Sequence, residues 1–173
     1  QIINDYDLLS SPINYISYQV RSLDEKVHNV QFFLGASPLI AVDKPNQPTV
    51  STIEVKKGIT YMRTGTVDQP ILARKGDHVC IDWGYLYLPD INGRVSLGQE
   101  DAVKSQFAKT GTLPATKDAI VARKPSQAPL LAYVHDFGKI EEGRSFALIG
   151  YDEIQDIQYM YKNYKGFWAH EGK

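Results

Sequence analysis

Cysteine, long apolar runs and an excess of charge of either sign are nearly absent from this sequence. Its 173 residues include one cysteine, Cys80, so the chain cannot form an intramolecular disulfide, and its cysteine usage indicates no cellular compartment. The longest stretch without a charge falls short of the roughly 20 apolar residues that span a bilayer. The 19 basic and 20 acidic residues give a net charge of −1, which predicts no binding to nucleic acid or to a membrane.

Motifs for catalysis, cofactors and metals are missing as well. The chain has no Gly-rich phosphate loop, no His-Glu-x-x-His, no Cys-x-x-Cys and no Gly-x-Ser-x-Gly. Its four histidines, at positions 28, 78, 135 and 170, share no metal-ligand spacing. Ser, His and Asp are all present, but distance along the sequence does not show that they converge. We therefore expect no metal, no cofactor and no complete catalytic set in this chain.

Alternation of apolar and polar residues predicts a chain made mainly of strands. Seven segments have strand character: 16–21, 30–34, 52–55, 60–63, 79–88, 130–137 and 145–151. The first two flank a polar break at 24–26 and are expected to form a β-hairpin. Segment 79–88 is apolar on both faces, which is typical of a central strand covered on both sides.

Two segments have helical character. Residues 97–109 follow a capping candidate, Ser96, and precede Gly111, which favours one short interior helix. In the tail, Ile154, Ile157, Tyr161, Tyr164 and Trp168 recur every three or four residues, which predicts a C-terminal helical segment. The predicted fold is all-β: a single antiparallel β-sandwich domain over residues 1–173, with these two helical segments.

The block at 82–85 is the first candidate binding site. Asp82 places an acid beside the aromatic rings of Trp83 and Tyr85, and Gly84 allows a ligand or another backbone to approach closely. The favoured alternative is a core strand whose aromatic rings are packing and whose aspartate bonds a loop.

Three other side chains have both a chemical and a structural interpretation. His135 and Asp136 could act as an acid–base pair at a strand end, although a structural hydrogen bond is the favoured alternative. Cys80 alternates out of phase with Trp83 in an apolar segment, so we expect it to be a buried, inert thiol.

Several blocks in order resemble one known family. They are Asp7-Leu-Leu-Ser-Ser-Pro12, Tyr15-Ile-Ser-Tyr-Gln-Val-Arg-Ser22, Val27-His-Asn-Val-Gln-Phe32, Asp82-Trp-Gly-Tyr-Leu-Tyr-Leu88, Thr110-Gly-Thr-Leu-Pro114, Val134-His-Asp-Phe-Gly-Lys139 and Phe146-Ala-Leu-Ile-Gly-Tyr-Asp-Glu-Ile154. Together they look like the β-domain that precedes the helical domain in glutaminase A-type proteins of fungi and Bacteroides-like bacteria. One departure is Asp24-Glu25, where the family usually has Asp-Gly in the turn.

The resemblance implies a secreted or periplasmic parent that hydrolyses the side-chain amide of glutamine, giving glutamate and ammonia. It also implies a β-sandwich packed on an α-helical toroid that holds the active site. In that family the β-domain begins some strands before Gln1 and the toroid follows Lys173, so we expect an N-terminally truncated domain. Such a fragment is expected to be inactive alone, to support the toroid, and to contact it through Trp168.

Two further expectations concern binding. A carbohydrate- or peptide-binding module of a secreted hydrolase is the alternative function, because β-sandwiches often have that role; it requires exposed aromatic rings, whereas a support domain should bury them. An unpaired sheet edge is expected to favour a homodimer.

Overall fold

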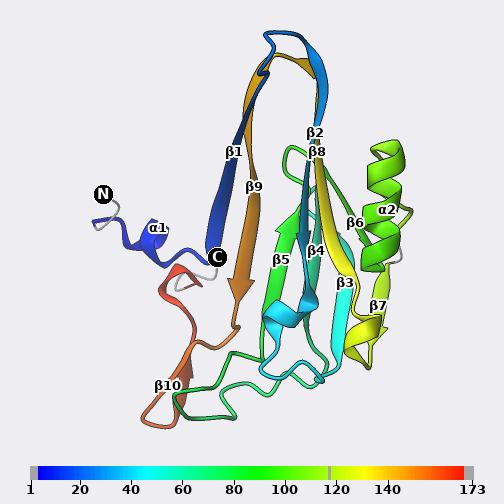
Figure 1. The fold of residues 1–173 in the computed structure, drawn as a ribbon. Coiled ribbons are helices and arrows are strands. Elements are labelled where there is room, and N and C mark those ends of the chain that lie inside the picture. Colours follow the sequence, from blue (N-terminus) through cyan, green and yellow to red (C-terminus); the bar gives the residue numbers. More distant parts are fainter. Residues whose placement is uncertain (1–3, 117, 170–173) are drawn as a thin grey trace.

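The computed structural model describes residues 4–116 and 118–169. Two antiparallel sheets pack face to face (Figure 1), and a third sheet of two short strands lies in the tail. The larger sheet has the order β1-β9-β5-β4-β3-β7, and its strands are β1 Ile13–Arg21, β9 Glu142–Asp152, β5 Tyr85–Pro89, β4 Ile59–Thr66, β3 Thr49–Lys56 and β7 Ala119–Ala122. The smaller sheet has the order β2-β8-β6, from β2 His28–Ala36, β8 Leu130–Ile140 and β6 Arg94–Gly98. The predicted all-β sandwich is confirmed.

Helix α2, Glu100–Thr110, is the predicted interior helix, and it lies beside the smaller sheet (Figure 1). Val103 is fully buried and the Phe107 ring lies 4.9 Å from that of Phe33 in β2. The helix begins after Gln99; Ser96 lies in β6, where its hydroxyl donates to the Pro114 carbonyl. Gly111 ends the helix at φ 66°, as expected of a left-handed C-cap.

The remaining helical elements are short: α1 Tyr6–Ser10 and the 3₁₀ turns η1 Pro38–Ala41, η2 Pro125–Gln127 and η3 Phe167–Ala169. Among the described residues, none of the helices has the length and apolar character needed to cross a bilayer.

The predicted hairpin of 16–21 with 30–34 is wrong, because the two strands belong to different sheets. Strand β1 pairs with β9 in the larger sheet, and β2 pairs with β8 in the smaller one. The β1–β2 and β8–β9 connections therefore each arch from one sheet to the other (Figure 1). The Tyr18 ring of β1 stacks on Phe32 of β2 across the sandwich, with ring centroids 3.7 Å apart. Within the first arch Glu25 has φ 57°, the left-handed conformation for which glycine is best suited.

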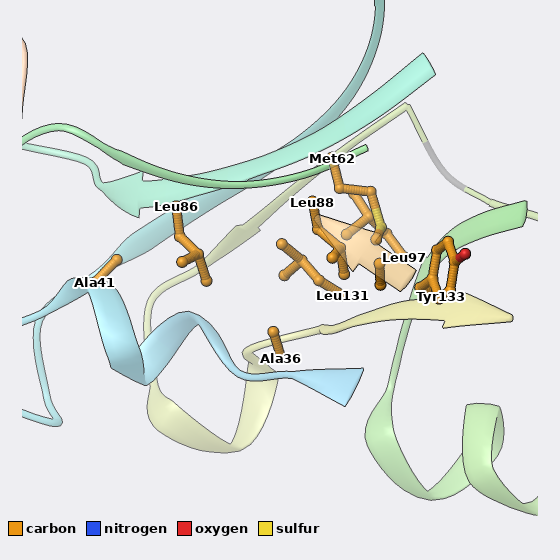
Figure 2. Close-up of a cluster of buried hydrophobic side chains, with 9 residues drawn as sticks. Ala36, Ala41, Met62, Leu86, Leu88, Leu97, Leu131 and Tyr133 are labelled. Carbon is orange, nitrogen blue, oxygen red and sulfur yellow. The ribbon is translucent and has the colours of Figure 1, made fainter. Parts of the chain in front are cut away.

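The core fills the space between the two sheets. Met62, Leu86 and Leu88 of the larger sheet face Leu97, Leu131 and Tyr133 of the smaller one, as Figure 2 shows, and all six side chains are buried. Burial of the Tyr133 ring raises the pKa of its phenol, which donates a hydrogen bond to the Ile91 carbonyl at 2.9 Å. Hydrophobic burial between the sheets therefore fixes the two layers relative to each other.

The predicted C-terminal helix over 154–168 is also wrong. Residues 157–164 form a small hairpin from β10 Ile157–Tyr159 and β11 Lys162–Tyr164, in which Ile157 pairs with Tyr164. Met160 and Tyr161 form its turn with φ values of 49° and 63°, a conformation that no right-handed helix contains. Ile157, one position of the predicted helical stripe, is 58% exposed. Only η3, at the end of the described tail, is helical.

Candidate functional site

The Asp82 carboxylate is fully buried, and two loops reach it. Residues 79–84, predicted as the start of a strand, are irregular, and β5 begins only at Tyr85. Gln47 Nε2 donates to Asp82 Oδ2 at 2.7 Å, and the Arg74 guanidinium lies 3.3 Å from the same oxygen. Asp82 Oδ1 has no hydrogen-bond partner among the described residues. The aspartate thus joins the loops at 43–48 and 70–84 rather than facing solvent.

Asp43 completes this network of charged and amide groups. Its carboxylate pairs with Arg74 and accepts a hydrogen bond from the Cys80 backbone N–H at 3.0 Å. Gln47 Oε1 in turn accepts from the Asp43 N–H at 2.7 Å. Each acid is neutralised by the arginine or held by an amide, which makes this a structural connection between loops. Cys80 itself is exposed, so the expectation of a buried thiol is wrong.

Trp83 lies in the protein interior, in agreement with the core interpretation of 82–85. Its side chain is 7% exposed, and Nε1 donates to the Gln155 carbonyl at 2.9 Å. The Trp83 carbonyl accepts from the Tyr151 hydroxyl at 2.8 Å, and burial raises the pKa of Tyr151 to about 12. Gly84, at φ 81°, lies so close to the Asp152 carbonyl that a Cβ would overlap it. Gly84 therefore allows the close approach of another backbone segment, at Asp152, rather than of a ligand.

Tyr85 alone of this block lies on the outer face of the larger sheet. It belongs to a row with Tyr87 and Tyr61, whose ring centroids lie 5.8 Å apart. The Arg63 guanidinium sits over the Tyr85 ring at 4.5 Å and pairs with Glu54 at 2.8 Å. Burial raises the pKa of Tyr87. The row combines aromatic faces with charged groups, which suits a polar ligand that stacks on rings.

His135 and Asp136 do not form a pair, because neighbouring residues of a strand point to opposite faces. His135 Nδ1 lies 2.8 Å from the Tyr18 hydroxyl, and its ring lies 4.2 Å from that of Phe137. Asp136 is exposed and accepts from the Gly138 N–H at 2.8 Å, which lowers its pKa. The structure therefore separates the histidine from the carboxylate that an acid–base pair would need.

Two concave regions lie at the surface of the sandwich. The first, of about 840 Å³, lies beside residues 144–146 of β9 and is lined about equally by polar and apolar groups; Ser17, Tyr18, Asn92, His135, Arg144 and Ser145 are among its lining residues. The second, of about 410 Å³, is almost wholly apolar and includes Ile13, Ile59, Tyr61, Tyr87, Leu148 and Trp168. We call them the β9 cleft and the outer pocket. Trp168 thus lies against the outer face, half-buried.

The sequence analysis did not identify most residues of the two concave regions as candidate site residues. Arg144 and Asn92 carry no motif, and Leu148 is recognisable only as one position of an alternating strand. The sequence analysis had singled out two of the lining residues: Trp168 of the outer pocket, as a contact with a helical partner, and His135 of the β9 cleft, as a candidate acid or base.

Among the described residues, no group of three or more His, Cys, Asp or Glu side chains is placed to hold a metal ion. A search of curated proteins found no match to this chain. One family model, described as a domain of unknown function (DUF5127), matches residues 1–173. Since that match spans the whole sequence, the chain belongs to the DUF5127 family.

Proposed function

We propose that this chain is the non-catalytic β-sandwich domain of a secreted or periplasmic glutaminase-like amidohydrolase, and that it packs on and supports the helical toroid carrying the active site. The ordered sequence blocks that resemble glutaminase A-type proteins support this proposal, since they extend over most of the chain. The parent reaction is hydrolysis of glutamine to glutamate and ammonia.

The outer pocket is the observation that carries the proposal. Ile13 of β1 and Leu148 of β9 contribute to it from the sheet, and Trp168 contributes from the tail. Ile13 is 50% exposed and Ile59 is 42% exposed, so apolar surface is left open to solvent around a concave centre. Apolar surface of this shape suits a helix that inserts large side chains, which is what a helical toroid presents.

The candidate chemical groups of this chain already have structural partners, which favours support over catalysis. Asp82 is engaged by Gln47 and Arg74, and Trp83 is in the core. His135 contacts a tyrosine hydroxyl rather than a carboxylate. A general base for amide hydrolysis needs a carboxylate or an imidazole within hydrogen-bond reach of the reacting water.

Ammonia release from glutamine tests the proposal. The chain alone is expected to release no ammonia above background in a coupled assay, and the same chain joined to the helical region of its parent is expected to be active. Robust turnover by this chain alone, abolished by replacing His135 or Asp82, contradicts the proposal.

A matched pair of variants tests the outer pocket as the contact surface. Leu148→Ser places a hydroxyl in the pocket, whereas Val121→Ser makes the same kind of change at a 56% exposed position of β7. In the two-domain protein, Leu148→Ser is expected to lower the melting temperature of the helical domain, and Val121→Ser to leave it unchanged. Equal effects of the two variants argue against docking through this pocket.

The row of tyrosines favours carbohydrate binding as the alternative function. Tyr61, Tyr85 and Tyr87 lie half-buried together on the outer face with Arg63 beside them, and aromatic faces stack on sugar rings. Neutral oligosaccharides that quench tyrosine fluorescence in this chain, but not in Tyr85→Ala, support the alternative. Absence of quenching favours the support role.

The free edge of β1 favours self-association as a further property. In the described part of the chain β1 pairs with β9 on one side only. An unpaired edge of nine residues can bond to the same edge of a second copy. Sedimentation is expected to show a dimer, and Ser17→Pro, which blocks the centre of that edge, is expected to give monomers.

A further inference from the structure

The backbone of β9 presents hydrogen-bonding groups on the side away from β1. The Tyr151 N–H donates to the Pro12 carbonyl at 3.1 Å, and the Ser22 N–H donates to the Glu141 carbonyl at 2.7 Å. In an antiparallel ladder every second residue bonds to a given neighbour. The odd-numbered residues of β9 therefore bond to β1, and the even-numbered residues, Arg144 among them, point to the opposite side.

Strand β5 fills only part of that opposite side. It pairs with β9 at residues 150–152, through Tyr85, Leu86 and Tyr87. The next bonded position in this register is Pro89 opposite Leu148, and proline has no N–H to continue the ladder. After Pro89 the chain turns through 90–93 into β6 of the other sheet.

Two residues of β9, and the carbonyl of a third, are consequently left with unused backbone groups. Within residues 4–116 and 118–169, no strand pairs with Arg144 or Phe146 on this side, and Pro89 has no N–H to offer the Leu148 carbonyl. Arg144 and Phe146 each offer one N–H and one C=O, and Leu148 offers its C=O. The β9 cleft, about 840 Å³, lies alongside, so this edge borders an open space rather than a packed one.

Several side chains around the cleft carry polar groups, and contacts hold two of them in place. The Tyr18 ring is fixed by stacking on Phe32, and its hydroxyl fixes the His135 ring. Asn92 lies at the cleft from the β5–β6 turn. Arg144 is exposed, and among the described residues no carboxylate forms an ion pair with it. The cleft thus combines an open strand edge with an unneutralised positive charge.

We propose that this edge of β9 binds an extended segment of another polypeptide as an added strand, with an acidic side chain of that segment beside Arg144. The added strand lies in line with β5, beyond Pro89, and bonds to the N–H and C=O groups of Arg144 and Phe146 and to the C=O of Leu148. Directly opposite residues of paired strands share a face, so the residue opposite Arg144 lies next to its guanidinium. Main-chain bonds supply affinity, and the arginine supplies the preference for acid. The proposal does not depend on a helical partner domain.

A labelled heptapeptide with blocked ends, Thr-Val-Thr-Glu-Thr-Val-Thr, is the probe for this edge. Fluorescence anisotropy at low salt is expected to show saturable binding with a Kd below about 1 mM. Replacing the glutamate of the peptide by lysine, or Arg144→Gln in the protein, is expected to weaken binding by about fivefold, as for one partly exposed ion pair. Absence of saturable binding overturns the proposal.

Three variants locate the contact. Phe146→Pro removes an outward N–H from β9 and is expected to weaken binding at least tenfold, whereas Phe146→Ala keeps the N–H and is expected to bind nearly as the parent does. Val121→Pro removes an outward N–H from the edge strand β7, away from the β9 cleft, and is expected to leave binding unchanged. Equal binding by Phe146→Pro and the unmodified protein overturns the proposal.

Hydrogen exchange of the unmodified protein gives a test that needs no variant to fold. Saturating peptide is expected to slow exchange at the amides of Arg144 and Phe146 and to leave those of Tyr15 and Ser17 unchanged. Protection confined to β1 overturns the assignment to β9.

Discussion

Replacement of Trp83 by alanine is the sharpest test of whether the 82–85 block is packing or a binding platform. The side chain is 7% exposed, and its Nε1 donates to the Gln155 carbonyl at 2.9 Å. Deletion of a buried tryptophan ring costs about 3–5 kcal/mol of unfolding free energy. For a chain of this length that loss corresponds to a fall in melting temperature of about 10 °C.

Two further variants divide that cost into its causes. Trp83→Phe keeps most of the ring but removes the donor to the Gln155 carbonyl, and is expected to cost about 1–2 kcal/mol. Tyr159→Ala, at a 61% exposed position of β10, is expected to stay within about 0.5 kcal/mol of the parent. Urea denaturation followed by circular dichroism measures all three. A Trp83→Ala protein that unfolds at the same urea concentration as the parent refutes the core assignment.

The remaining predictions concern backbone, thiol and pH. Gly84→Ala is expected to destabilise the fold by more than 2 kcal/mol because a Cβ at φ 81° would overlap the end of β9, while Gly138→Ala, with open space around it, should cost about 1 kcal/mol; equal melting temperatures would count against this. Cys80 should react fully with a thiol reagent in the native protein, and protection until denaturant is added would contradict its exposure. The hydrogen bond from His28 lowers the pKa of Asp24 from 3.8 to about 2, so its stabilising effect is complete above pH 4 and is lost as pH falls through 2; an NMR titration midpoint near 3.8 would disprove this.

Local periodicity was enough to identify strands but not their partners. Alternation at 16–21 and 145–151 reflects one buried and one exposed face, and both segments are strands. Their pairing joins Ile13 to Gly150 across most of the chain, and no short-range pattern encodes it. A polar break between two strands predicts that the chain reverses its direction. A hairpin within one sheet and an arch between two sheets both reverse the chain, so the break does not distinguish them.

The tail shows how a helical pattern can arise without a helix. Ile157 and Tyr164 lie seven residues apart, which is two turns of a helix, yet they are also the two outer partners of a hairpin with a tight turn. The left-handed φ values at Met160 and Tyr161 exclude the helix and allow the hairpin. Neither methionine nor tyrosine favours that conformation, so the sequence does not predict it.

The sequence by itself determined the all-β class, the single interior helix with its Gly111 cap, and the aromatic character of the 82–88 block, because these depend on residues close together in the chain. Tertiary structure alone decided that Asp82 meets Gln47 and Arg74, that Trp83 is internal while Tyr85 is external, and that β9 keeps a free edge beyond Pro89. These features depend on the relative positions of segments that are distant in the sequence. Burial of the whole core between the two sheets determines those positions, and the conformational preferences of any one segment do not.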